Sequence, residues 1–382
     1  IKIDGQTLVD GGNYNQLKVI PRESKQNQND IDGLYDVAWT NGQRFNLGSH
    51  NLGGTLNALY EIRDGNNRGN LQGTISAQAG DNELILYDTT INDVERLNIP
   101  ETGVITVGNM NYSYKGFEVK IDEDTGKFTY NFELENPIIN DALDVTATIG
   151  ESINYKGIPY YLGQMNQFIR TYAKAFNEIH RSGRDLNNKQ GTDFFTATNK
   201  VNGREYVFGP LDESDDYASY DFSRFDSQTG SFYEEIADDK PLYGSYYFMT
   251  VDNFTINKNL INDPKFFAAS TDIINGVDNN DIVDELIALK RKKDMFGSGE
   301  PGGFMNTLVA DIGIDARKAN NFSESQENIL RSISNQRLSV SGVDMDEEAM
   351  SLVRFQNAYN LSAKVISVMD EIYDRLILYM GV

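Results

Sequence analysis

The chain has 382 residues, which is enough for two or three domains that each bury a core of their own. Its 57 acidic side chains outnumber its 34 basic ones, and the formal net charge of −23 disfavours a nucleic-acid partner, because such a partner requires a basic surface. The chain has no Cys, which excludes disulfides, thiolate metal sites and cysteine nucleophiles. Its two histidines, His50 and His180, stand in unrelated contexts. We therefore expect no catalytic residues, no metal site and no cofactor.

Residues 1–67 predict a β-hairpin region followed by a short helix. Residues 1–20 alternate apolar and polar positions around Gly5 and a later Gly pair, as the strands of hairpins do. A polar loop is predicted from Arg22 to Asp30. Apolar residues in 53–64 then recur at helical spacing, and the Gly-Asn-Asn run that follows them predicts the end of the helix.

Residues 68–155 predict an all-β domain. The apolar period is two in 104–107, 117–121 and 128–134, which is the pattern of half-buried strands. The acidic run 122–126 resembles a calcium loop, but it lacks the Glu at the twelfth position, and strands flank it closely. We therefore predict a hairpin turn at this run.

Residues 156–195 predict a long trunk helix that packs along one side. Its apolar positions lie alternately three and four residues apart, which is the spacing of a heptad seam, and Gly183 predicts the end of the helix. His180 lies beside the seam near the C-terminal end, where an imidazole suits the helix dipole, so we predict a structural role for it. The predicted seam contains Leu162, Met165, Ile169, Tyr172, Phe176 and Ile179.

A second, mostly β domain is predicted over 196–255. Short aromatic-rich segments predict its strands, the last of them at 246–251. An acidic tract at 212–226 predicts a solvated surface, with a site for a hard cation as the alternative.

Helices are predicted again over 256–343. Apolar periodicity places one at 280–291 and another at 314–340. The Gly-rich run at 297–303 predicts a linker between them.

Residues 344–382 predict one long coiled-coil helix. Asp344 is suited to cap it, with Glu347 three residues later, and no Gly or Pro interrupts the chain before Gly381. Such a helix has about 36 residues and a length of about 54 Å. Two apolar columns recur every seven residues, as the a and d positions of a coiled coil do. The candidate assembly residues in these columns are Leu352, Phe355, Tyr359, Ile366, Met369, Tyr373, Leu376 and Met380.

A third apolar column makes this stripe wider than a two-stranded coiled coil needs. It contains Ala358, Val365, Ile372 and Tyr379. Such a helix requires several neighbours, which are other helices of this chain, other copies or partner proteins. We therefore predict that this helix acts in assembly.

The run Ser-Val-Ser-Gly-Val-Asp-Met-Asp-Glu-Glu at 339–348 leads into this helix and continues in 352–359 and 363–366. Together these stretches resemble the C-terminal end of the bacterial flagellar hook-associated protein 1 family. The stretches 176–183 and 193–195 occur in the order in which that family has them. Because other flagellar axial proteins share a related end, hook protein is an alternative.

The resemblance and the periodicity together predict an α+β multidomain fold, in which an α-helical coiled-coil trunk is built from discontinuous segments and carries two inserted β domains. Residues 68–155 depart from the family pattern, and residues 196–249 match none of its motifs. The resemblance also implies that the chain, which begins at Ile1 without an initiator Met, is a fragment lacking an N-terminal helical region. The implied trunk segments are 1–67, 156–195, 256–343 and 344–382, and the implied insertions are 68–155 and 196–255.

The function implied by the resemblance is structural. The protein would join the hook of the flagellum to its filament by self-assembly through terminal helices, without catalysis, after secretion from the cell. The implied partners are copies of the chain in a ring of about eleven, hook protein, the next junction protein of the filament and a flagellar export chaperone. We expect no membrane insertion, since the chain has no run of about 18 apolar residues.

A competing hypothesis is a glycan-binding or enzymatic surface protein that acts through its β domains. Function is often carried by loops on a rigid scaffold, and Asp215 with Asp226 would supply a carboxylate pair for glycoside hydrolysis. The sequence sets no distance between these two carboxylates. A glycan screen and a turnover assay on the β domains distinguish this class from a structural subunit.

Overall fold

The computed structural model describes residues 2–3, 5–48, 53–121, 125–200, 203–208, 242–243, 245–272, 279–297, 299–342 and 344–379. His50 and the acidic tract 212–226 lie outside these residues. The chain divides into two compact units, residues 1–308 and residues 309–382. Both helices and sheets are present, so the predicted α+β class is confirmed, whereas the coiled-coil trunk and the domain boundaries stay predictions.

The N-terminal region consists of three two-stranded antiparallel pairs and a short helix; the pattern in 1–20 predicts the hairpins there, whereas the strand at 35–39 in the third pair was not predicted. Gly5 has a φ of 76°, which allows the tight turn between the first two strands. Trp39 and Tyr60 are buried in a small core of this region. Its elements are β1 (Lys2–Ile3), β2 (Gln6–Thr7), β3 (Val9–Asp10), β4 (Asn13–Tyr14), β5 (Leu17–Pro21), β6 (Tyr35–Trp39) and α1 (Thr55–Asp64).

The predicted all-β region forms a six-stranded closed barrel with the strand order β10-β11-β8-β7-β12-β9. Closure pairs every strand on both sides and leaves no open sheet edge. The predicted hairpin turn is confirmed by the pairing of β10 with β11, in which Ile121 lies opposite Phe128; Asp122 to Asp124 are outside the described residues. The strands are β7 (Leu71–Ala77), β8 (Glu83–Tyr87), β9 (Gly103–Val107), β10 (Met110–Ile121), β11 (Phe128–Leu134) and β12 (Ala142–Ile149).

The chain enters and leaves the barrel at one place, beside the start of α2 (Ile158–Ser182). The backbone N–H of Gly157 donates to the carbonyl of Gly65 at 3.0 Å, and that of Asn67 donates to Tyr155 at 2.8 Å. A Cβ on Gly65 would lie 2.3 Å from the Glu61 carbonyl oxygen, so this junction requires glycine. The barrel therefore has the closely spaced ends expected of an insertion between α1 and α2.

The region after α2 differs from its prediction at 246–251. Residues 246–248 form a 3₁₀ turn instead of a strand, and their aromatic side chains are buried. The strand prediction was wrong because aromatic residues favour strands only where a neighbouring strand is available. The elements here are β13 (Phe195–Ala197), β14 (Tyr206–Val207), β15 (Leu242–Tyr243), η1 (Tyr246–Phe248) and β16 (Phe254–Ile256).

The core of the barrel is continuous with this buried aromatic turn. The rings of Phe117 in the barrel and Tyr247 in the turn have centroids 5.7 Å apart, and the Tyr247 hydroxyl donates to the Ile99 carbonyl at 2.6 Å. The barrel and the turn therefore share packing across a boundary that the sequence places between two domains.

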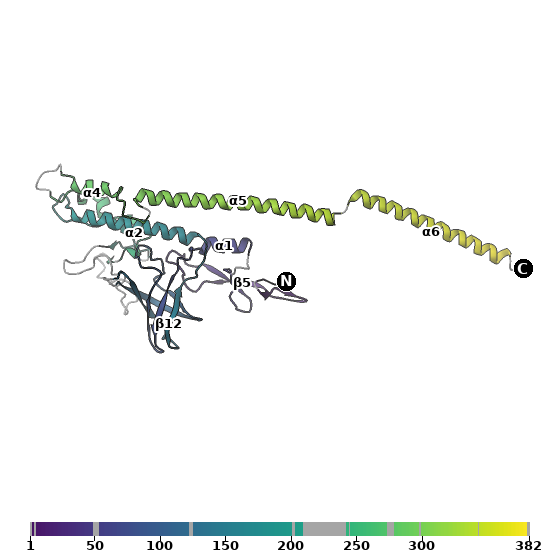
Figure 1. The fold of residues 1–382 in the computed structure, drawn as a ribbon, viewed down its shortest axis with the longest axis horizontal. Coiled ribbons are helices and arrows are strands. Elements are labelled where there is room, and N and C mark those ends of the chain that lie inside the picture. The colour runs from purple at the N-terminus through teal and green to yellow at the C-terminus, as the bar shows by residue number, and fades with distance from the viewer. Residues whose placement is uncertain are drawn as a thin grey trace. The chain divides into compact units, whose positions relative to one another are not determined.

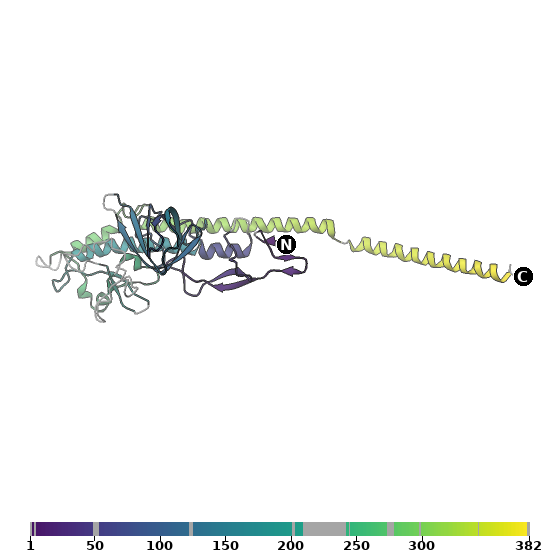
Figure 2. The same ribbon diagram turned by 90° about the horizontal axis from the view of Figure 1, so that it is seen from below.

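The helices that follow are α3 (Lys258–Asn262), η2 (Pro264–Phe266), α4 (Asp281–Leu289), α5 (Pro301–Ser341) and α6 (Met345–Tyr379). Helix α4 lies within the predicted range and alongside α2, as Figure 1 shows. The prediction of a linker at 297–303 was wrong at its end, because α5 begins at Pro301 inside it. Proline is favoured in the first turn of a helix, where its missing N–H costs nothing. In Figure 2 the strands β1 to β6 lie beside α1.

Candidate assembly surface

Helix α6 starts where the sequence predicts. The Asp344 side chain accepts a hydrogen bond from the backbone N–H of Asp346 at 2.9 Å, and its carbonyl accepts one from Glu348 at 2.9 Å. The first turn carries three carboxylates, which the positive end of the helix dipole stabilises. The predicted N-cap is therefore confirmed.

The predicted assembly residues of α6 that the structure describes are exposed along the whole helix. Leu376 exposes 52% of its surface and Tyr359 exposes 75%, and the other described members lie between these values. No residue of α6 in the described range 345–379 is buried, and Met380 lies outside the described residues. Monomeric proteins rarely expose a contiguous apolar surface of this extent, which is typical of interaction sites.

The third column is exposed as well. Val365 and Ile372 are about half exposed, and Tyr379 exposes 82% of its surface. An ion pair between Arg375 and Glu371 at 3.1 Å lies four residues apart on the same helix, and both side chains are solvated. Such pairs add only about 0.3 to 0.5 kcal/mol, so apolar side chains dominate what α6 offers to a partner.

Helix α2 shows the opposite arrangement, with a buried polar column. Asn166, Arg170, Ala173, Asn177 and His180 are all buried, and they follow one another at intervals of four, three, four and three residues. The six predicted seam residues are half-buried. All of them except Leu162 come one residue before a member of this column in the sequence. The deepest contacts of α2 are therefore made by polar side chains.

Arg170 is fully buried and has hydrogen bonds for all five of its N–H groups. Its Nε donates to the Met249 carbonyl at 2.8 Å, and one Nη donates to the carbonyls of Leu97 at 2.7 Å and Glu95 at 3.3 Å. The other Nη donates to the Tyr247 carbonyl at 2.6 Å and to Gln28 Oε1 at 2.7 Å. Burial lowers the pKa of Arg170 to about 10, so the side chain is charged at neutral pH. One cation thus joins α2 to three distant segments.

The two asparagines of the column act in the same way. The Asn177 amide oxygen accepts from the backbone N–H groups of Phe194 and Phe195, both at 2.9 Å, and its nitrogen donates to the Phe195 carbonyl at 2.8 Å. Asn166 donates to Asn29 Oδ1 at 3.2 Å and accepts from the Val251 backbone at 3.0 Å. These bonds hold irregular segments against the helix.

His180 has a structural role in this column. Its Nε2 accepts from the backbone N–H of Ala268 at 3.0 Å, so the proton lies on Nδ1, which donates to the Thr192 carbonyl at 2.6 Å. Burial lowers the pKa of His180, which keeps the ring neutral. Both nitrogens are occupied, which leaves neither for a metal.

The seam residues of α2 contact several neighbours. Ile169 packs against the barrel core, while Phe176 and Ile179 pack against the buried residues of α4. The Tyr172 ring lies 6.2 Å from both Phe176 and Phe195. Leu162 and Met165 are half-buried nearer the start of the helix.

The apolar pattern of the sequence does not reveal this column, because all of its members except Ala173 are polar. A signal was nevertheless present, since Arg170 and Asn177 repeat at seven residues, as do Asn166, Ala173 and His180. A polar heptad beside an apolar one is typical of a solvated helix edge, and only the position of distant segments shows that it is buried.

Two absences hold for the part of the chain that the structure describes. Within it, no group of three or more acidic or histidine side chains has a geometry that would hold a metal ion. No helix among the described residues is long and apolar enough to cross a bilayer. The cation alternative at 212–226 lies outside this range.

Comparison with known proteins places α6 in a defined class. The family model for the flagellar basal body rod FlgEFG protein C-terminal region matches residues 334–377, which include most of α6. The C-terminal segment is therefore of the flagellar rod type.

Relatives that match about three fifths to two thirds of this chain narrow this class. Flagellar hook-associated protein 1 of Bacillus subtilis strain 168 is 27% identical over 228 residues, covering 59% of this chain and 37% of the relative. The protein of the same name from Escherichia coli K12 is 24% identical over 283 residues, 65% of this chain and 51% of the relative. The protein of the same name from Salmonella typhimurium LT2 is 23% identical over 299 residues, which cover 67% of this chain and 52% of the relative. The resemblance to the hook-associated protein 1 family is confirmed, and the chain is a homologue of these proteins that spans about a third to a half of their length.

Proposed function

We propose that this protein is a non-enzymatic structural subunit of the bacterial flagellum that joins hook to filament by self-assembly. The supporting observation is the exposed apolar surface of α6, within the segment that matches the flagellar rod family. Burying one such side chain contributes about 1.5 to 3 kcal/mol, so seven of them supply ample free energy for association.

The proposal includes the partners and location. Copies of the chain, in a ring of about eleven, would bury the α6 columns between neighbours. Hook protein would lie on one side of the ring and the next junction protein on the other, outside the cell. Before secretion, an export chaperone would cover the same apolar columns, because they are exposed in the single chain.

A matched pair of double variants tests the role of α6. Tyr359→Asp with Ile366→Asp adds two carboxylates at two positions of one apolar column, seven residues apart. Asn360→Asp with Ser367→Asp adds the same two charges one residue later on the same helix. Burying an unpaired carboxylate costs several kcal/mol, whereas a solvated one changes stability by about 0.5 kcal/mol or less.

Both double variants are introduced into the full-length protein in its own bacterium, and swimming and filament attachment are measured. We expect the column variant to lose filaments and the matched control to keep them. Equal loss in both, or loss in neither, would contradict the assembly role of these columns. Gold-labelled antibody on isolated flagella locates the protein, and label along the whole hook would favour the hook-protein alternative.

A further inference from the structure

A polar groove runs across the outside of the barrel, far in sequence from α6. Segment 20–26 forms one wall, and the outer faces of β7, β9, β10 and β12 form the floor. The groove has a volume of about 630 Å³, which lies in the range of roughly 300 to 1,000 Å³ usual for small-molecule sites.

The floor presents one row of neutral polar side chains across four strands. Gln72 on β7 lies opposite Thr148 on β12, and Thr148 lies opposite Thr106 on β9. Thr106 in turn lies opposite Asn111 on β10. Neighbouring strands are about 4.8 Å apart, so the row extends over about 14 Å. Within it, the Thr106 hydroxyl donates to Asn111 Oδ1 at 2.9 Å, which orients that amide.

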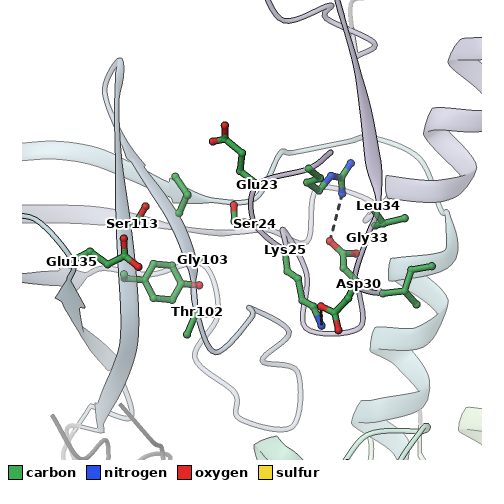
Figure 3. Close-up of a pocket in the computed structure, with 15 residues that line it drawn as sticks. Glu23, Ser24, Lys25, Asp30, Gly33, Leu34, Thr102, Gly103, Ser113 and Glu135 are labelled. Carbon is green, nitrogen blue, oxygen red and sulfur yellow. Dashed lines mark ion pairs between the residues drawn. The ribbon is translucent and has the colours of Figure 1, made fainter. Parts of the chain in front are cut away.

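The wall is held rigidly by buried ion pairs. Arg22 contacts Asp36 at 2.8 Å and Asp64 at 2.7 Å, and Asp30 lies 3.5 Å away. Figure 3 shows a second hollow, of about 420 Å³, which Glu23, Ser24 and Lys25 of this wall also line, and its dashed line marks the ion pair of Asp30. A fixed wall lowers the entropic cost of ordering the groove around a ligand.

The charges that line the groove cancel. Three cations and three carboxylates contribute to it, and Arg44 pairs with Glu151 at 2.7 Å. On a chain with a net charge of −23, this groove has no excess of either sign to attract a phosphate, an acidic sugar or a metal ion. The charged lining residues are Arg22, Lys25, Arg44, Glu23, Asp36 and Glu151.

We propose that this groove binds a neutral oligosaccharide. Hydroxyl and amide side chains, repeated across the strands, match the ring hydroxyls of an extended uncharged sugar chain. A peptide strand fits less well, because peptide recognition by strand addition needs an open sheet edge and the barrel is closed. An apolar ligand would leave the polar row without hydrogen bonds. This inference rests on the barrel and is independent of the role proposed for α6.

The test uses the full chain and a glycan array with neutral and acidic sugars, followed by calorimetric titration of maltoheptaose, cellohexaose and chitohexaose. Trigalacturonate serves as the charged probe. We expect binding of at least one neutral oligosaccharide and none of trigalacturonate. No binding of any neutral glycan at millimolar concentration, or equal binding of the charged probe, would overturn the proposal.

A matched pair of variants locates the binding. Gln72→Ala with Thr148→Ala removes a facing pair from the floor. Thr74→Ala with Thr146→Ala removes the next facing pair on the same two strands, which does not line the groove. We expect the first variant to weaken binding about tenfold or more, because two hydrogen-bonding groups are lost, and the second to change it less than about twofold.

Asn111→Ala supplies a test that does not risk the barrel, because Asn111 is exposed at the end of the row. It should weaken binding about fivefold with an unchanged unfolding midpoint. Equal affinity in the groove variants and in the Thr74 and Thr146 control would overturn the assignment of the sugar to this groove.

Discussion

Helices α2 and α6 both carry heptad repeats, yet they use them in opposite ways. In α2 the polar column is buried and the apolar seam is half-buried; in α6 the apolar columns are exposed. The polar side chains of α2 bond to backbone groups in the loop at Met249, the 3₁₀ turn at Tyr247 and the start of β13 at Phe195. The comparison indicates that α2 organises the interior of its own chain, while the apolar surface of α6 stays exposed, as the assembly role proposed for it requires.

The hydrogen bonds of Arg170 make it the most sensitive position of α2. Replacing it by Met removes the donors for the buried carbonyls of Leu97, Tyr247 and Met249. We expect Arg170→Met to lower the free energy of unfolding of residues 1–308 by about 3 to 5 kcal/mol. Trp39, the one tryptophan of the chain, is buried in this unit, so its fluorescence during urea unfolding measures the change.

Lys174→Met is the control, since Lys174 lies one turn further along α2 and is half-buried. Its ion pair with Glu95 at 3.5 Å is partly solvated and contributes about 1 kcal/mol or less. A similar loss in both variants would mean that the buried column is no more important than the edge of the helix.

Asn177→Leu should have the next largest effect. The leucine has the same branched shape, with four heavy atoms in its side chain, but leaves the N–H groups of Phe194 and Phe195 and the Phe195 carbonyl without their partner. We expect a loss of about 2 to 4 kcal/mol in the same urea experiment. A loss below about 0.5 kcal/mol would show that these backbone groups find water instead.

The lowered pKa of His180 predicts that the free energy of unfolding changes with pH, by about 1.4 kcal/mol per pH unit at most. Burial lowers its pKa in the folded chain, so the unfolded chain binds a proton first as the pH falls through about 6.5. The contribution of the neutral ring to the free energy of unfolding is therefore present above that pH. It is lost as the pH falls toward the pKa that His180 has in the folded chain. Arg181 and Asp193 are the charged groups that act on this ring.

A difference measurement isolates this effect. Burial and the neighbouring Glu95 raise the pKa of Asp93 to about 7. Asp93 therefore affects the free energy of unfolding in the opposite direction, because its contribution to stability is lost as the pH rises. We therefore compare unfolding of the native chain with that of His180→Gln between pH 5 and 8. The stability advantage of the native chain should shrink as the pH falls, and a pH-independent difference would exclude His180 as its source.

The smallest expected effect is that of the α6 variants on residues 1–308. All buried residues of the three hydrophobic clusters precede residue 309. We expect Tyr359→Asp with Ile366→Asp to shift Trp39-detected unfolding by less than about 0.5 kcal/mol. A larger shift would show that α6 stabilises the first unit and would remove the contrast between the two helices.

The elements that could be predicted before folding are those whose signals are local. Period two predicted the barrel strands, and the capping Asp344 followed by an uninterrupted heptad predicted α6, because a strand or a helix depends on neighbouring residues. The same pattern predicted that the α6 columns need neighbours, and it left open whether these are other helices of the chain, other copies or partner proteins.

Tertiary structure alone decided the closure of the barrel, the 3₁₀ turn at 246–248 and the burial of the α2 polar column. The bonds of Arg170 reach residues 28, 95 to 97 and 247 to 249, which lie more than 70 residues from it along the chain. No local propensity encodes such contacts. A buried arginine becomes favourable only after folding has placed enough carbonyl oxygens around it, so its role is a property of the assembled chain and not of its helix.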